Sequence, residues 1–394
     1  MIIALCGKPS SGKSTFFKAS TLAEVEISSR PFTTIKYNEG IAFVSIDCVD
    51  KEFKKQCNPR EGFCINHKRF IPVKLIDIPG LIKDSHKGKG LGNQFLDDLR
   101  QADALIHVID LSGSTDDNGN PVDPLSHDPI KDIEFLDYEL DMWHYQLLMK
   151  GWKKFARQVQ QENLNIKKAL AKQLSGLKIT EEDVENSIKK LKLLHNPEEW
   201  SDKDLKDLAR ELRKTKPIVI SANKLDVEGA LYNLDRLQKK FSDYIIIGCS
   251  AEIELALREA HKKKLIEYVP GDKDFKIIGD LNEKQKKGLE FVKGYLEKYE
   301  NSGVQEVINK IVLDMLEYIA VYPGGVNKLE DSDGNTLPDC FLMKKDSTAL
   351  DFAFRLHTDF GNNFIKAMDV KHKRAIGKEH KLKHQDVIEI MYKK

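Results

Sequence analysis

The sequence is poor in cysteine, in long apolar runs and in charge of one dominant sign. Six cysteines in 394 residues argue against a disulfide scaffold and favour a reducing compartment, the cytoplasm. No apolar stretch approaches the about 20 residues that a membrane-spanning helix requires, so we expect no membrane partner. The 63 Lys and Arg residues balance the 62 Asp and Glu residues, and the net charge of +1 argues against a uniformly basic nucleic-acid binder.

The chain does have enough apolar material for more than one core. Hydrophobic residues make up 41% of its 394 positions, and this length predicts two or three domains. Apolar residues 2–6 run directly into a glycine-containing loop, with no basic segment ahead of them. They therefore predict a buried strand rather than a signal peptide.

Alternating apolar and helical segments predict an α/β fold. Residues 2–6, the loop after them and the helical residues 13–19 form the strand–loop–helix opening of a nucleotide-binding domain. Further buried strands are expected at residues 41–46, 71–76, 104–109, 217–222 and 244–249.

The pattern changes after residue 128. Loosely spaced apolar positions predict a helical insertion, which we expect to be a hairpin with coiled-coil character. An amphipathic helix over residues 303–319 is expected to close the α/β domain, and the turn Pro323-Gly324-Gly325 predicts a boundary. We therefore divide the chain into residues 1–128 and 215–322 (the two parts of the α/β domain), 129–214 (the insertion) and 323–394 (a small β-rich domain).

The loop after the first strand fits the phosphate-binding pattern G-x-x-x-x-G-K-[ST]. In such a loop, backbone N–H groups surround phosphate oxygens, and the following helix adds a partial positive charge. Lys13 is expected to reach the β- and γ-phosphates, and Ser14 to place its hydroxyl on Mg²⁺. The candidate nucleotide-binding residues here are Gly7, Lys8, Pro9, Ser10, Ser11, Gly12, Lys13, Ser14 and Thr15.

Asp77 and Gly80 close the apolar segment 71–76 in the order Asp-Ile-Pro-Gly. A carboxylate at a strand end opposite a phosphate loop is a second anchor for Mg²⁺, usually through water. The Gly80 N–H is placed to contact the γ-phosphate.

Two further motifs predict that the base is guanine. In Asn223-Lys224-Leu225-Asp226, the Asp226 carboxylate can accept hydrogen bonds from the guanine N1–H and exocyclic amine, whereas adenine would face it with a lone pair. The backbone of Ser250, Ala251 and Glu252, after the next strand, can recognise the guanine carbonyl. The motifs together predict binding of GTP or GDP with Mg²⁺.

With these motifs in order, the chain resembles the Obg–YchF group of translation-factor-related GTPases. The resemblance rests on residues 30–35 (RPFTTI), 77–82 (DIPGLI) and 87–96 (KGKGLGNQFL). Residues 337–345, continuing to 386–388, resemble a TGS domain, a β-grasp module. The resemblance implies a P-loop GTPase (Ras-like) domain with a helical coiled-coil-like insertion and a C-terminal TGS domain, in the archaeal and fungal YchF-like branch.

The resemblance also implies that Thr34 is the switch threonine, with its hydroxyl on Mg²⁺ and its N–H on the γ-phosphate. Thr33 is the alternative. Well-known YchF proteins lack a good Asn-Lys-x-Asp motif and accept ATP, whereas this chain has the motif, so we expect GTP. Many relatives carry Asn where this chain has Ser10, and that Asn is associated with potassium-stimulated hydrolysis, so the sequence leaves potassium dependence open.

Hydrolysis lacks an obvious water-orienting side chain. Many GTPases carry Gln after the D-x-x-G glycine, but this chain has Leu81. His107, the one polar residue within an apolar strand, is a candidate catalytic residue beside Lys13, Thr34 and Gly80. The alternative is that His107 is a satisfied core histidine. His86 is a second candidate, for which a solvated loop residue is the favoured interpretation.

Two basic clusters suggest contact with RNA phosphates, with ordinary solvated surfaces as the alternative. The TGS resemblance favours ribosome or RNA contact through the insertion and the TGS domain. The clusters are Lys153, Lys154, Arg157, Lys167, Lys168, Lys172 and Lys178, and Lys366, Lys371, Lys373, Arg374, Lys378, Lys381 and Lys383.

Four possible zinc ligands follow the Thr-Thr pair: Cys48, Cys57, Cys64 and His67. Their intervals of eight, six and two residues do not match a standard zinc finger. The favoured interpretation is that the cysteines are reduced loop residues.

The sequence thus predicts a GTPase that acts as a translation-related switch on the ribosome or RNA. A GTP-gated RNA-binding scaffold with vestigial hydrolysis is the alternative, motivated by Leu81. A small-molecule kinase is disfavoured by the Asn-Lys-x-Asp motif.

Overall fold

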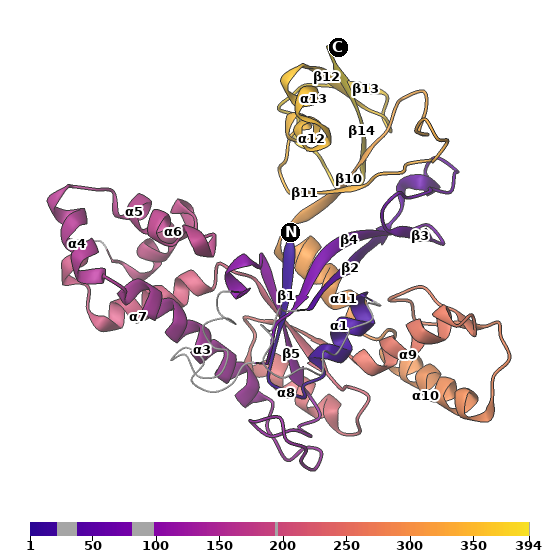
Figure 1. The fold of residues 1–394 in the computed structure, drawn as a ribbon, viewed down its shortest axis with the longest axis horizontal. Coiled ribbons are helices and arrows are strands. Elements are labelled where there is room, and N and C mark those ends of the chain that lie inside the picture. The colour runs from indigo at the N-terminus through magenta and orange to yellow at the C-terminus, as the bar shows by residue number, and fades with distance from the viewer. Residues whose placement is uncertain (22–37, 81–97, 194–195, 394) are drawn as a thin grey trace. The chain divides into compact units, whose positions relative to one another are not determined.

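The computed structural model describes residues 1–21, 38–80, 98–193 and 196–393 (Figure 1). Its chain forms two compact units, each made of several segments. The first comprises residues 1–40, 74–268 and 273–304, and the second residues 41–73, 269–272 and 305–394. Among the described residues, no helix is long and apolar enough to cross a membrane.

In the part of the chain that the structure describes, the main sheet has seven strands and is mostly parallel. Parallel pairing joins β1 to β4 and β5, β5 to β6, and β6 to β7, while β3 pairs with β4 in the antiparallel sense. Every residue of β5 and β6 is buried, as expected for strands inside a parallel sheet. In spatial order, the strands are β2 (Asn38–Asp47), β4 (Lys68–Asp77), β1 (Ile2–Cys6), β5 (Ala104–Asp110), β6 (Ile218–Asn223) and β7 (Ile245–Gly248), with β3 (Phe63–Ile65) on β4. The predicted α/β class is confirmed.

Outside the insertion, the described helices of the first unit alternate with strands along the chain. Ser250 caps α9 by accepting a hydrogen bond from the Ile253 N–H at 3.3 Å, and Asn282 forms a capping box with Gln285 at the start of α10. These helices are α1 (Lys13–Thr21), α8 (Ala230–Lys240), α9 (Ala251–Lys262) and α10 (Glu283–Tyr299), with the short strands β8 (Ile266–Glu267) and β9 (Lys276–Ile277) before α10.

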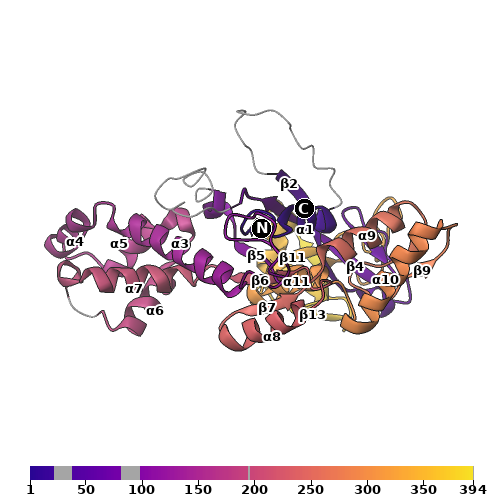
Figure 2. The same cartoon turned by 90° about the horizontal axis from the view of Figure 1, so that it is seen from below.

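The described residues of the insertion form five α-helices, so the expected simple hairpin is wrong. Helices α4–α7 gather around α3 in both views (Figures 1 and 2). Capping boxes at Thr180 and Ser201 start α6 and α7, and Trp152 stacks on Trp200 with ring centroids 5.5 Å apart. The two capping boxes and the stacked tryptophans divide this apolar segment into several short helices instead of two long ones. They are α3 (Ile130–Met149), α4 (Trp152–Gln161), α5 (Ile166–Gln173), α6 (Glu181–Leu191) and α7 (Asp202–Arg213).

The C-terminal sheet begins earlier than the predicted boundary at residue 323. Helix α11 (Val304–Asn309) continues as a π-helical segment, Lys310–Met315, and ends before Glu317, whose φ of 52° is incompatible with a continuing helix. The next residues form β10 rather than the end of the expected helix.

Within the described residues, this second sheet has five strands, and two short helices pack against it. Val321, Phe352 and Ile388 lie in its core. The spatial order is β11 (Phe341–Lys344), β10 (Tyr318–Pro323), β14 (Asp386–Tyr392), β12 (Phe364–Asp369) and β13 (Arg374–Ile376), with α12 (Ala349–Leu356) and α13 (Thr358–Asn362) between β11 and β12 in the chain.

Candidate nucleotide-binding site

The phosphate-binding loop has a backbone that requires glycine at two positions. Gly7 has φ 151° and Gly12 has φ 91°. A Cβ atom would lie 2.3 Å from the Val108 carbonyl oxygen at Gly7, and 2.0 Å from Asn223 Nδ2 at Gly12. Ser10 also has a positive φ, of 60°. The loop can therefore follow its tight path between β1 and α1 only with glycine at positions 7 and 12.

Lys13, Ser14 and Asp77 come together at the ends of β1 and β4. The Lys13 ammonium forms an ion pair with Asp77 Oδ1, and the Ser14 hydroxyl donates to Asp77 Oδ2 at 3.3 Å. A hydroxyl and a carboxylate are the hard oxygen donors that Mg²⁺ prefers, so this pair fits the expected ion. Thr33 and Thr34 lie outside the described residues.

Gly80 lies against the phosphate-binding loop. A Cβ atom there would lie 3.1 Å from Pro9 Cγ. On the other side of the loop, Lys8 is 5% exposed, donates to the Thr115 carbonyl at 2.9 Å and pairs with Asp132 at 3.1 Å. The Lys8 side chain thus anchors the loop, and only its backbone is available to a phosphate.

Asn223 joins the phosphate side of the site to the base side. Its Nδ2 donates to the Ser11 carbonyl at 3.0 Å, and its Oδ1 accepts from the Ala251 N–H at 2.9 Å. The side chain is buried, so both bonds are shielded from water. The Asn223 amide thus holds two protein loops together, and its assignment to the nucleotide stays a prediction.

Lys224 is held by a buried carboxylate that sequence reasoning missed. Its Nζ donates to Asp110 Oδ2 at 2.9 Å and to Ser114 Oγ at 3.2 Å. Burial alone would raise the pKa of Asp110, but hydrogen bonds from Ser112, Lys224 and Thr115 outweigh it and lower the pKa. The available signal was an Asp at a strand end followed by a cluster of small hydroxyl residues.

The other residues predicted to recognise the base lie after β6 (Asp226) and at the start of α9 (Ala251 and Glu252). Asp226 is half-buried, and no hydrogen bond joins its carboxylate to another described residue. Ala251 is buried, and Glu252 is exposed in the first turn of α9. Asp226 therefore keeps its acceptor atoms available.

His107 lies inside the sheet, beside Cys6 of β1 and Ile220 of β6. It is 3% exposed. Burial, with a smaller contribution from the Lys8 charge, lowers the pKa of His107 to about 3. The imidazole is therefore neutral near pH 7. Leu81 and His86 lie outside the described residues.

Three family models match the chain in succession. Residues 2–141 match one described as a 50S ribosome-binding GTPase, and residues 333–392 match the TGS domain. Residues 221–325 match the G4 motif-containing domain of YGR210-like Obg-like GTPases. The uncharacterized GTP-binding protein MJ1332 of Methanocaldococcus jannaschii is 48% identical over 394 residues, which cover 99% of this chain and 98% of the relative. The chain belongs to the Obg-like GTPases, in their YchF-like branch.

Two further relatives and one solved structure are similar to this chain over most of its length. A GTP-binding protein of Schizosaccharomyces pombe, C428.15, is 33% identical, with 89% of this chain and 88% of the relative covered. The protein named ribosome-binding ATPase YchF of Bacillus subtilis is 26% identical over 93% of this chain and 87% of its own. The crystal structure of a GTP-binding protein from Pyrococcus horikoshii matches with a TM-score of 0.78 and 38% identity, covering 100% of both chains. The predicted P-loop GTPase fold with a C-terminal TGS domain is confirmed.

Proposed function

We propose that this protein binds GTP with Mg²⁺, hydrolyses it to GDP and phosphate, and acts as a switch on the ribosome or another RNA. The observation that carries the GTP assignment is the free Asp226 carboxylate beside the loops that Asn223 joins. The switch assignment rests on the family and on the motif order around the γ-phosphate position.

Catalysis would depend mainly on fixed positive charge and backbone donors. Lys13 would exchange its Asp77 partner for the phosphates and stabilise charge in the transition state. Ser14 and Asp77 would hold Mg²⁺, with Thr34 added by resemblance, and Mg²⁺ would neutralise phosphate charge. Gly80 would donate its N–H to the γ-phosphate.

His107 would act as an acceptor for the attacking water rather than as a strong base, because its pKa is about 3. This role is tested by comparing His107→Ala with His107→Gln. We expect kcat to fall about 100-fold in the first variant, with partial recovery in the second because Gln can still accept a hydrogen bond. Equal kcat in all three proteins would make His107 a core residue only.

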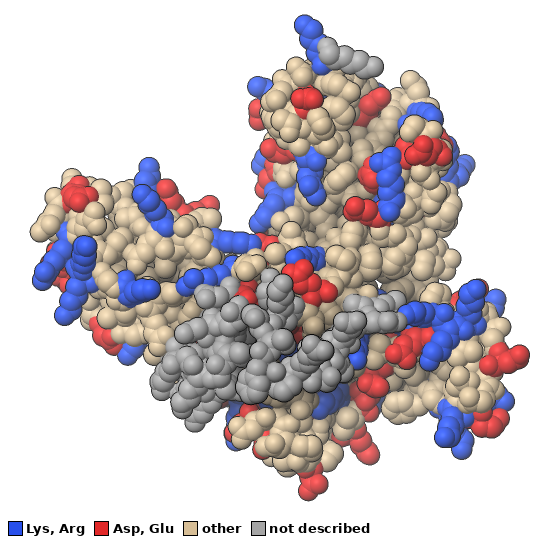
Figure 3. All heavy atoms as spheres, in the orientation of Figure 1, with Lys and Arg blue, Asp and Glu red and all other residues tan. Residues whose placement is uncertain are grey.

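The RNA assignment rests on a groove between α4 and α5. The groove has a volume of about 820 Å³ and is bordered by Lys150, Lys154, Lys168 and Lys172. None of these four lysines forms an ion pair with another described residue. Lys and Arg spheres gather over this part of the molecule (Figure 3, left). Unpaired cations beside a groove fit a phosphate backbone.

The C-terminal basic cluster is a weaker candidate because four of its seven basic side chains, Lys378 with Glu379 among them, form ion pairs. Lys371 pairs with Glu52 at 2.6 Å, Arg374 with Asp369 at 3.2 Å, and Lys381 with Asp346 at 2.8 Å. In the insertion cluster, Lys167 and Lys178 are paired in the same way. The name of the relative YchF, a ribosome-binding ATPase, supports a ribosomal partner.

The groove is tested by charge reversal. A Lys154→Glu, Lys168→Glu double variant should bind ribosomes or ribosomal RNA more weakly, with a smaller slope of log affinity against log salt. A Lys371→Glu, Lys381→Glu variant is the control, because those side chains are already ion-paired. A larger loss in the control would move the RNA site to the TGS domain.

The first experiment is steady-state hydrolysis of GTP and ATP, with and without ribosomes, by the wild type and Asp226→Asn. We expect GTP-selective turnover that ribosomes stimulate, and a loss of about 100-fold or more in kcat/KM for GTP in the variant. Xanthosine triphosphate should restore turnover to the variant, because an Asn amide can donate to the carbonyl that replaces the guanine amine. Equal use of ATP by the wild type would contradict the base assignment.

A GTP-gated RNA-binding scaffold is the second candidate, favoured by apolar Leu81 where many GTPases carry a water-orienting Gln. Nucleotide-dependent RNA binding without turnover, even with ribosomes present, would support the scaffold over the hydrolase.

A further inference from the structure

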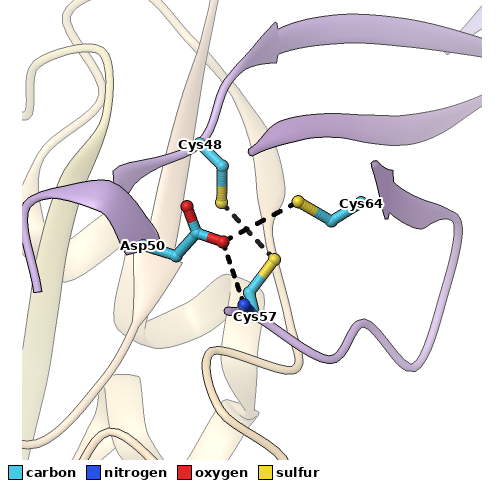
Figure 4. Close-up of side chains that lie close together, drawn as sticks. All are labelled: Cys48, Asp50, Cys57 and Cys64. Carbon is cyan, nitrogen blue, oxygen red and sulfur yellow. Dashed lines mark hydrogen bonds between the residues drawn. The ribbon is translucent and has the colours of Figure 1, made fainter. Parts of the chain in front are cut away.

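Three cysteine thiols and one carboxylate converge in the second unit, outside the nucleotide site. Cys48 follows β2, Asp50 lies in the next turn, Cys57 lies in the loop after it, and Cys64 lies on β3 (Figure 4). Their four donor atoms all lie within 4.8 Å of one another. The loop and the β3–β4 hairpin thus bring together residues that are up to 16 positions apart in the sequence, from Cys48 to Cys64.

The spacing of these atoms fits one tetrahedral ion. The Cys48 and Cys57 sulfurs are 3.4 Å apart, and the Cys64 sulfur is 3.8 Å from Asp50 Oδ2. Zn²⁺–S bonds of about 2.3 Å place two tetrahedral sulfurs about 3.8 Å apart. A disulfide would require about 2.05 Å, and none of the six cysteines, all within the described residues, forms a disulfide.

We propose that Cys48, Asp50, Cys57 and Cys64 bind a zinc ion. Three thiolates and one carboxylate form a donor set that favours Zn²⁺ over the hard cations Mg²⁺ and Ca²⁺. Three of the four residues are buried, and Cys64 is half-buried, so the ligands are shielded as in a structural site with no open position.

Asp50 is oriented for this role by two contacts. His67 Nδ1 lies 2.8 Å from Asp50 Oδ1, and the Cys57 N–H donates to Asp50 Oδ2 at 2.9 Å. The carboxylate is fully buried. His67, which sequence reasoning placed among the possible ligands, is a positioning residue that holds the carboxylate.

Arg69 supplies positive charge beside the thiolates. It is 1% exposed, and its Nη1 lies 3.6 Å from the Cys57 sulfur. Within the described part of the chain, no carboxylate forms an ion pair with it, and its Nε has no hydrogen-bond partner. A buried guanidinium without a counter-charge is costly, and an anionic thiolate cluster would provide that charge.

The same arginine connects the cluster to the start of the TGS domain. Arg69 donates to the carbonyls of Leu337 and Pro338 at 3.0 and 2.8 Å. The Asn58 N–H donates to the Thr336 carbonyl at 2.9 Å, and the Arg60 side chain pairs with Asp331 at 2.8 Å. A bound ion would therefore fix the loop that packs against residues 330–339.

Metal content tests the site directly. Full-length protein, purified under reducing conditions and dialysed against a weak chelator, should retain about one zinc per chain by elemental analysis. Co²⁺ added to chelator-stripped protein should give thiolate-to-metal charge-transfer absorption and the intense visible bands of tetrahedral Co²⁺. Cys57→Ser should lose both signals.

Cys340→Ser is the matched control. Burial raises the pKa of the Cys340 thiol, which also contacts Tyr322, but Cys340 is not among the converging donors. The Cys340→Ser variant should therefore retain about as much zinc as the wild type. Loss of zinc in Cys340→Ser equal to that in Cys57→Ser would overturn the proposed ligand set.

If Cys57→Ser does not fold, the site can still be tested by removing zinc from the wild-type protein and adding it back. Zinc returned to stripped wild-type protein should raise Tm by about 5 °C or more, whereas Mg²⁺ should not. Substoichiometric zinc together with no Co²⁺ charge-transfer absorption would overturn the proposal. A mass decrease showing a Cys48–Cys57 disulfide in protein purified without reductant, with no metal, would replace it with a redox pair.

Discussion

The nucleotide site and the cysteine cluster are both built from loops at strand ends, yet the sequence predicts only the first. It offers three of the cluster's residues as possible ligands but favours reduced loop cysteines instead. The nucleotide site uses short contiguous motifs whose backbone geometry depends on Gly7 and Gly12. The cluster uses single residues from a turn, a loop and a hairpin, and the intervals between them have no standard pattern. Local motifs reveal sites that the backbone forms, whereas sites formed by side chains across a fold require the structure.

The largest expected effect is a loss of GTP turnover in Lys13→Ala, which should leave the cysteine cluster unchanged. Lys13→Ala should reduce GTP turnover by about 100- to 1000-fold, because it removes the charge that stabilises the transition state. The zinc content of the Lys13→Ala variant should equal that of the wild type, since Lys13 belongs to the first unit and the cysteines belong to the second. Steady-state kinetics and elemental analysis on one preparation give both results. A parallel loss of zinc would show that the regions are coupled.

Arg69→Met tests the charge balance of the cluster. It should lower the free energy of unfolding by about 3 kcal/mol, because the thiolates and the carbonyls of Leu337 and Pro338 lose a buried donor. Urea denaturation measures the change. In a double-mutant cycle with Cys57→Ser, the combined cost should be less than the sum of the single costs. Strict additivity would contradict the thiolate–guanidinium pairing.

Asn223→Ala tests the corresponding support in the nucleotide site. It removes two buried hydrogen bonds, to Ser11 and Ala251, and should weaken GDP binding by about 30- to 100-fold. Fluorescent GDP titration measures the affinity. Asn233→Ala is a control with a buried amide that donates to the Leu111 carbonyl at 2.9 Å. An equal loss of affinity in the control would assign the effect to general destabilisation.

The smallest expected effect is a pH dependence from His107. Its pKa is about 6.5 when unfolded and about 3 when folded, so the unfolded chain binds the proton first as the pH falls. The contribution of neutral His107 to the free energy of unfolding is fully present above pH 6.5. Between pH 6.5 and about 3 it declines by about 1.4 kcal/mol for each unit by which the pH falls. Urea unfolding at pH 7, 6 and 5 should show a shallower decline for His107→Gln. An unchanged slope would mean that His107 does not titrate as described.

The sequence predicted the α/β class, the order of the motifs and the convergence of Lys13, Ser14 and Asp77, because each depends on local pattern and on parallel strand ends. It did not predict the roles of Lys8 and Asp110, since their partners Asp132 and Lys224 are distant in the chain. The helical hairpin was wrong because capping boxes at Thr180 and Ser201 outweigh loose apolar spacing. Cys48, Cys57 and Cys64 were set aside as zinc ligands, and Asp50 was not considered, because intervals along the chain carry no information about which residues meet in the fold.

The single amide of Asn223 also limits how the protein can change. It donates to the loop at Ser11 and accepts from the loop at Ala251, so neither loop can move far while the other stays in place. A substitution that reshapes the base pocket would therefore disturb phosphate binding as well. Changes of nucleotide preference in such a protein would require compensating substitutions in both loops, and variants with only one of them would be selected against.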